Sequence, residues 1–166
     1  MSYFFNFDKM EYVKGPRPDG CILCLIRDKS EAVADLTVFA DELFTVSVNL
    51  YPYNPGHLMV FPNRHVEDVR DLTEDEEHRV TVLTRRILDV LDLTHQPAGY
   101  NIGYNMGGSA GASIDHLHLH IIPRYPREIG IADLVAGKRV LIEDPRVTQR
   151  RVREAFEVEP RNRGAQ

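Results

Sequence analysis

Apolar residues recur every three to four positions along one long stretch in the middle of the chain. Thr73 and Glu76, at its start, have the spacing of a capping box, and Pro97 and Gly99 follow its end. A helix with one buried face is expected between these signals. The residues of its apolar face are Val80, Leu83, Ile87, and Val90 or Leu91.

Shorter apolar stretches, some of them alternating with polar residues, predict β-strands. Residues 36–48 contain two such stretches separated by acidic residues, which is typical of a hairpin or of two adjacent strands. Further strands are expected at 57–62, where a proline ends the pattern, at 100–105 and at 116–123.

A second, shorter helix is expected near the C-terminus. Asp144 and Pro145 have the pattern of a helix N-cap and first helical residue, and the helix would run through about Phe156. Strands and helices do not alternate regularly along the chain. The pattern therefore predicts an α+β domain with a mainly antiparallel sheet, one long helix and a short C-terminal helix.

The composition is that of a single globular domain. Of the 166 residues, 43% are hydrophobic and 27% are charged, so we expect one domain over residues 1–158 and a flexible tail over 159–166. No apolar run is long enough to span a membrane, and the N-terminus lacks a signal peptide, so a cytoplasmic protein without a membrane partner is expected. The net charge of -5 disfavours nucleic acid as a partner.

Three histidines, His116, His118 and His120, occupy alternate positions of the strand expected at 116–123. Period-two geometry would place the three imidazoles on one face and the leucines between them on the core side. Buried imidazoles need hydrogen-bond partners, so this arrangement is costly for structure alone. The alternatives are a polar strand that faces solvent, a three-histidine metal site, and nucleophilic catalysis by one of the rings.

A loop of small residues, 107–113, precedes the histidines. Its backbone N–H groups can approach an anion closely, and Ser113 adds a hydroxyl donor. A phosphate suits these donors better than a metal-bound water does. The loop therefore favours phosphate chemistry.

Cys21 and Cys24 are the only cysteines of the chain. In a cytoplasmic protein so close a pair indicates a metal or redox site rather than a structural disulfide. With His65, just past the strand at 57–62, and His116, they could complete a tetrahedral and purely structural Cys2His2 zinc site. The rival interpretations are a pair of buried thiols and a thioredoxin-like redox motif, which the lack of a surrounding βαβ pattern disfavours.

Residues 116–122 have the pattern His-φ-His-φ-His-φ-φ, in which φ is apolar, and thereby resemble the signature of the histidine-triad (HIT) superfamily. Asn49, the segment 55–58 (Pro-Gly-His-Leu) and the small-residue loop strengthen the resemblance, which covers roughly residues 20–125. Within the superfamily, residues 49–57 look most like those of diadenosine polyphosphate hydrolases and phosphorylases.

The resemblance implies a catalytic set of His118, His120 and His57. His118 would attack the α-phosphorus to form a covalent nucleotidyl-histidine, later released to water, phosphate or another acceptor, while His57 and His120 would contact the phosphate oxygens. The implied nucleotide-binding residues are Asn49 at the ribose, Asn105 and Ser113 at the phosphate or leaving group, and Leu50, Gly111, His118 and His120.

The resemblance also implies a five-stranded sheet in each subunit, extended across a homodimer. It supports structural zinc, because some bacterial and archaeal members carry zinc with this arrangement of cysteines and histidines. No organic cofactor is expected. The expected partners are a nucleotide substrate, either an adenine dinucleotide or an AMP conjugate, and a second copy of the chain.

The function predicted from these residues is hydrolysis or nucleotidyl transfer from dinucleoside polyphosphates such as diadenosine tetraphosphate. An adenosine phosphoramidase that cleaves P–N bonds is the enzyme alternative. Two further alternatives are a nucleotide-binding sensor with incidental turnover and a catalytic metal centre formed by the histidines. Residues 126–139 could line the leaving-group side of the pocket, so the physiological substrate and the acceptor stay open.

Overall fold

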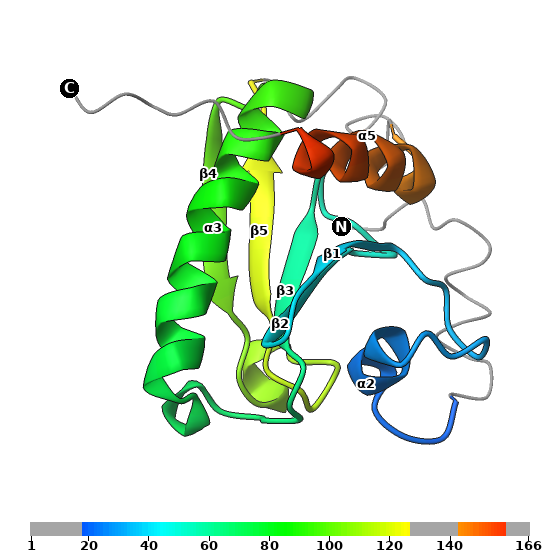
Figure 1. The fold of residues 1–166 in the computed structure, drawn as a ribbon, viewed down its shortest axis with the longest axis vertical. Helices are drawn as coiled ribbons and strands as arrows, with labels where there is room; N and C mark the ends of the chain where they lie inside the picture. The colour runs from blue at the N-terminus through cyan, green and yellow to red at the C-terminus, as the bar shows by residue number, and fades with distance from the viewer. Residues whose placement is uncertain (1–17, 127–142, 159–166) are drawn as a thin grey trace.

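A five-stranded antiparallel sheet with the order β1-β2-β3-β5-β4 forms the centre of the molecule (Figure 1). The computed structural model describes residues 18–126 and 143–158. The architecture confirms the predicted α+β fold with an antiparallel sheet. The strands are β1 (Thr37–Ala40), β2 (Phe44–Val48), β3 (Leu58–Pro62), β4 (Gly99–Tyr104) and β5 (Leu119–Arg124).

The two long helices, α3 (Glu74–Thr94) and α5 (Pro145–Glu157), pack on one face of this sheet (Figure 1). Every third or fourth residue of α3 is buried there, as the sequence predicted. The main core includes, from α3, Val80, Leu83, Ile87, Val90 and Leu91; from α5, Val152 and Phe156; and from β2, β3 and β5, Val46, Val48, Leu58, Val60, Leu119 and Ile121.

The opposite face of the sheet carries a smaller apolar cluster. Successive residues of a strand point to opposite faces, so Met59 and Phe61 of β3 face away from the main core. They pack instead with Leu23 and Ile26 of a short helix, α2 (Ile22–Arg27). This second face is the one on which the candidate site lies.

The residues that were expected to mark the starts of the two helices act as N-caps in the structure. Thr73 Oγ1 accepts a hydrogen bond from the Glu76 backbone N–H at 3.3 Å, and the Glu76 carboxylate accepts one from the Thr73 backbone N–H at 2.8 Å. This confirms the predicted capping box. The Asp144 carboxylate likewise accepts a hydrogen bond from the Arg146 N–H at the start of α5.

Two local features differ from the prediction. The last strand begins at Leu119 rather than at residue 116, because the Leu117 N–H donates to the Val66 carbonyl of a loop at 2.7 Å instead of to a neighbouring strand. Two of the three histidines of the triad therefore precede β5. The second difference is α2, a helix of six residues that the sequence patterns did not predict.

Within residues 18–126 and 143–158, no helix is both long enough and apolar enough to cross a membrane. The predicted tail at 159–166 lies outside the described residues, as does almost all of the segment 126–139 that was expected beside the leaving group.

Candidate functional site

Three imidazoles meet on the sheet face opposite α3 and α5. His57 immediately precedes β3, His118 immediately precedes β5, and His120 is the second residue of β5. The ring centroids of His57 and His120 lie 5.1 Å apart, and those of His118 and His120 lie 4.7 Å apart. The antiparallel pairing of β3 with β5, in which Met59 lies opposite His120, brings these segments together although they are far apart in the sequence.

Backbone groups fix the tautomers of these rings. The Tyr53 backbone N–H donates to Nδ1 of His57 at 3.1 Å, so His57 carries its proton on Nε2. That proton faces Nδ1 of His120 at 3.0 Å, which leaves the His120 proton on Nε2. His118 Nδ1 donates to the His116 carbonyl at 2.7 Å, so Nε2 of His118 has a free lone pair.

Burial keeps the three rings neutral. Desolvation, together with the neighbouring His120 and His118, lowers the pKa of His57 to about 3. Burial, with His118 next to it, lowers the pKa of His120 to about 4, and burial also lowers the pKa of His118. At neutral pH, Nε2 of His118 is therefore unprotonated and has a lone pair available for nucleophilic attack.

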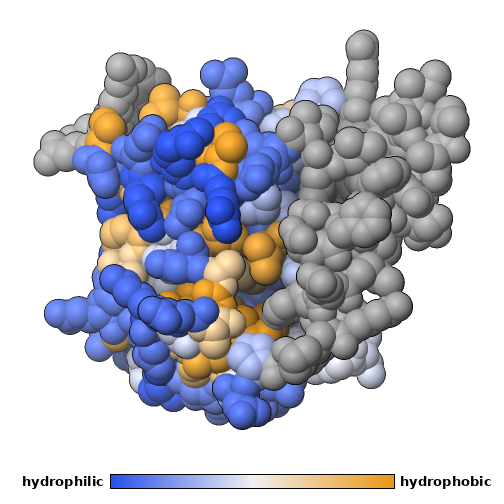
Figure 2. Space-filling model, turned by 90° about the vertical axis from the view of Figure 1, so that its right-hand side faces the viewer, coloured by the Kyte–Doolittle hydropathy of each residue, from blue (hydrophilic) through white to orange (hydrophobic). Residues whose placement is uncertain are grey.

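A cavity of about 460 Å³ opens beside His118 and His120. Apolar side chains from α2, β3 and the loop after α2 form one wall, and Figure 2 shows apolar residues gathered on this side of the molecule between hydrophilic ones. The lining contains all the residues that were expected to bind a nucleotide: Asn49, Leu50, Asn105, Gly111, Ser113, His118 and His120.

His57 does not line this cavity. Its ring is 0% exposed and lies behind His120, to which it is hydrogen-bonded. A direct contact of His57 with phosphate oxygens was expected from the sequence, whereas in the structure His57 contacts the cavity residues His120, Tyr53 and Asn49 and does not line the cavity itself.

The small-residue loop turns through a short 3-10 helix, η2 (Gly108–Ala110). Gly107 and Gly111 flank it with φ of +80° and +86°, values that side chains with a Cβ rarely adopt. Gly111 and Ser113, two residues later, both line the cavity. Replacing either glycine by an L-residue would strain this turn.

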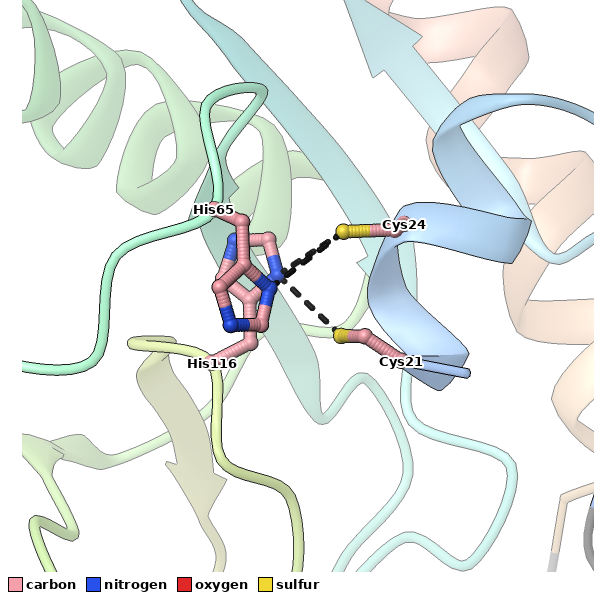
Figure 3. A group of neighbouring side chains, drawn as sticks. All are labelled: Cys21, Cys24, His65 and His116. Carbon is pink, nitrogen blue, oxygen red and sulfur yellow. Dashed lines mark hydrogen bonds between the residues drawn. The ribbon is translucent and has the colours of Figure 1, made fainter. Parts of the chain in front are cut away.

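A second group of side chains, Cys21, Cys24, His65 and His116, lies at the N-terminal end of α2 (Figure 3). One possible ligand atom from each lies within 4.8 Å of all the others. Figure 3 shows the two imidazoles side by side, facing the two thiols that extend from α2. The structure thus brings the four predicted zinc ligands together from three separate segments of the chain.

The spacing of these atoms suits a tetrahedral metal ion. Zinc bonds of about 2.3 Å to sulfur and about 2.0 Å to nitrogen place a sulfur and a nitrogen ligand about 3.5 Å apart. The distances from Nδ1 of His116 are 3.3 Å to Cys21 Sγ and 3.6 Å to Cys24 Sγ, and Cys24 Sγ lies 3.4 Å from Nδ1 of His65. The donor set and its geometry therefore fit zinc.

His116 is held in the correct tautomer for a ligand. Its Nε2 donates to the Pro62 carbonyl at 2.9 Å, which leaves the lone pair of Nδ1 facing the thiols. Burial, only partly offset by that hydrogen bond, lowers the pKa of His116 to about 4. The ring is therefore neutral and able to bind a metal at neutral pH.

The apolar wall of the cavity was not predicted from the sequence patterns. Met59 could have been found, because it lies two residues after His57 and shares its face of the sheet. The sequence could not have identified Ile22, Leu23 and Ile26 as cavity residues, because so short a helix carries no sequence signal that predicts its position.

Known proteins resemble the chain in sequence and in fold. The family model described as "HIT domain" matches residues 30–127. The chain is 39% identical over 116 residues to an "AP-4-A phosphorylase" of Mycobacterium tuberculosis, a match that covers 69% of this chain but only 60% of that protein. It is 32% identical over 122 residues to a "Bis(5'-adenosyl)-triphosphatase" of Dictyostelium discoideum, covering 74% of this chain and 82% of that protein.

Among solved structures, a zinc-bound histidine triad family protein from Mycobacterium smegmatis has the same fold, with a TM-score of 0.66. The superposition covers 83% of this chain and 94% of that one. The two sequences are 24% identical over it.

Proposed function

The chain belongs to the HIT domain family, and on that basis we propose that it is an enzyme that cleaves dinucleoside polyphosphates, such as diadenosine tetraphosphate, at the α-phosphorus. The observation that carries the proposal is the cavity in which a neutral, oriented His118 meets the donors of the small-residue loop. The named activities of the relatives from M. tuberculosis and D. discoideum support this substrate class.

The reaction takes place in two displacements. In the first, the lone pair of His118 Nε2 attacks the α-phosphorus, the bond from phosphorus to the bridging oxygen breaks, and the remaining nucleotide leaves with that electron pair. In the second, the oxygen of water or of inorganic phosphate attacks the same phosphorus and the bond from phosphorus to Nε2 of His118 breaks; an attacking water gives one proton to the solvent. The nucleophile regains its lone pair, and the nucleotide is released as AMP or ADP.

His120 acts on the charge that develops during both steps. Its Nε2–H can donate to a phosphate oxygen, while its Nδ1 is held by the Nε2–H of His57. The Tyr53 N–H fixes His57 in turn. Because this relay starts from the backbone, the donor on His120 is oriented before the substrate binds, which is the condition for efficient stabilisation of a transition state.

The remaining cavity residues hold the nucleotide. Asn105, Ser113 and the backbone near Gly111 would supply donors for the phosphates, and Asn49 would contact the ribose; all four residues line the cavity. Asn49 is itself oriented, since its Oδ1 accepts the Tyr51 N–H at 2.9 Å. The apolar wall offers a surface for the base.

We propose further that Cys21, Cys24, His65 and His116 hold a structural zinc ion. Bound there, zinc would supply a cross-link between α2, the segment after β3 and the segment before β5, with all four positions filled by protein. Metal analysis should find one zinc per chain in the wild type and a marked loss in Cys24→Ser; an equal zinc content in both would contradict the site.

The proposal includes a homodimer formed through β4. This strand is at the end of the sheet order and pairs only with β5 among the described strands, and its central Ile102 is 45% exposed. An unpaired edge is a template for a second copy. Sedimentation should give twice the chain mass for the wild type and the chain mass for Ile102→Glu; a monomeric wild type would rule the dimer out.

Incubation of wild type and His118→Ala with diadenosine tetraphosphate, with and without inorganic phosphate, tests the function. The wild type should release AMP or, if phosphate is the acceptor, ADP, and a nucleotidyl adduct should add to the protein mass. The exposed His78→Ala is the matched control. An inert wild type would exclude polyphosphates and call for phosphoramidate substrates and nucleotide binding to be assayed, and an active His118→Ala would exclude this nucleophile.

A further inference from the structure

The helix α2 belongs to two sites at once. Cys21 and Cys24, at its N-terminal end, are part of the metal cluster, while Ile22, Leu23 and Ile26 line the nucleotide cavity. We propose that the metal sets the position of α2 and thereby the nucleotide affinity of the cavity, so that metal and nucleotide bind cooperatively. This inference rests on the proposed function and adds a means of regulating the same site.

Within residues 18–126 and 143–158, few other interactions hold α2 in place. A helix of six residues is too short to be stable by itself, and the side chain of its N-cap residue, Cys21, makes no capping hydrogen bond. Among the described residues, its apolar residues Leu23 and Ile26 belong to the small cluster with Met59 and Phe61 and not to the main core. In the part of the chain that the structure describes, the polar link from its C-terminal end is the hydrogen bond that Arg27 Nη1 donates to the carbonyl of Asn63, just after β3, at 2.5 Å.

A bound metal would connect this helix to the rigid part of the molecule. His116 is buried and tied to Pro62 of β3, and His65 follows that strand. Thiolates bonded to the same ion would therefore be fixed relative to β3. Without those bonds, the position of the cavity wall depends on the small apolar cluster and on Arg27.

His116 gives the metal a second route to the cavity. Its ring belongs to the metal cluster, while its backbone carbonyl accepts the Nδ1–H of His118. Ile114, two residues earlier, packs against α2 and lines the cavity as well. Fixing the His116 ring therefore also fixes the backbone that orients His118.

Cooperative binding is reciprocal. If metal raises the affinity for a nucleotide by some factor, the nucleotide must raise the affinity for metal by the same factor. Because α2 forms one wall of the cavity rather than all of it, we expect a factor of about tenfold, within the usual range for coupled sites.

AMP is a suitable probe, because it fills the nucleotide cavity without being cleaved. Its dissociation constant is measured by calorimetry on zinc-loaded wild type, on chelator-treated wild type and on zinc-treated Cys24→Ser. The last two should bind AMP about tenfold more weakly than the first. A competition assay with a zinc chelator should show zinc held more tightly by the same factor when AMP is saturating.

Hydrogen exchange locates the effect. Removal of zinc should raise the exchange of α2 amides while the amides of α3 and β3 stay protected. Equal AMP affinity with and without zinc would overturn the coupling and leave the proposed function intact. Exchange that rises throughout the sheet would overturn it too, by showing that zinc holds the whole fold, and failure of the zinc-loaded protein to bind AMP would overturn both proposals.

Discussion

The face of the sheet under α3 and α5 is closed mainly by apolar side chains, whereas the opposite face buries His57, His116 and His118 beside a short helix. On the first face, stability comes from apolar surface removed from water, and no single contact determines the free energy of unfolding. On the second, each buried ring needs a particular backbone partner. Substitutions on the first face should therefore change stability alone, and those on the second should change the chemistry.

The largest effect is expected from His118→Ala. Loss of the proposed nucleophile should lower kcat/KM for diadenosine tetraphosphate by at least about a thousandfold, equivalent to about 4 kcal/mol in the barrier. The melting temperature should change little, because the substitution removes one ring at the border of a cavity. A variant that loses its activity together with its fold would contradict the separation of the two faces.

The second largest effect is expected from Ile87→Ala on the opposite side. Ile87 is 0% exposed in the main core, so its truncation should lower the free energy of unfolding in urea by about 2–5 kcal/mol. The kcat/KM of the folded fraction should stay that of the wild type. Val82→Ala, on the outer side of the same helix, is the control and should be nearly neutral. A large fall in kcat/KM for Ile87→Ala would break the comparison.

His57→Gln tests the relay that joins the buried part of the site to the cavity. The amide can still accept the Tyr53 N–H but cannot hold the His120 ring as the imidazole does. We expect kcat to fall about ten- to a hundredfold, a loss of the size of one or two hydrogen bonds to the reacting group, with little change in KM. If KM rose and kcat did not change, His57 would serve binding rather than catalysis.

The smallest effect is the pH dependence that His57 gives to stability. Its pKa is lowered in the folded state to about 3, so below pH 6.5 the unfolded chain takes up a proton that the folded chain does not. Stability is thus lost as the pH falls, by about 0.7 kcal/mol for this residue between pH 7 and pH 6. Urea unfolding of His57→Gln should show a smaller pH dependence by that amount; an unchanged slope would show that His57 is not the source.

Sequence periodicity predicted the first face almost completely. The apolar positions of α3, its capping box and the start of α5 follow from local chemistry, so residues such as Leu83 could be assigned to the core in advance. The antiparallel sheet followed in the same way, since alternation along a strand specifies which residues share a face.

The second face was predictable only where the chain carries chemically unusual residues. The four residues of the candidate metal cluster stand out because two cysteines three positions apart and histidines are residue types that bind metals. The position of α2 was not predictable, because its structure depends on contacts with β3 that no local pattern encodes. The late start of β5 has a similar origin, since Leu117 bonds to a loop that is distant in sequence.

Ile22 and Leu23 are the two residues between the cysteines, and both line the cavity. Leu23 is fully buried in the small cluster that holds α2, whereas Ile22 is only partly buried. If the flanking thiols fix the backbone on either side, the side chain of Ile22 can be exchanged with less effect on the path of the chain. Position 22 is therefore a natural place to engineer base preference: a library at this one codon would sample new pocket shapes while Leu23 keeps the helix packed.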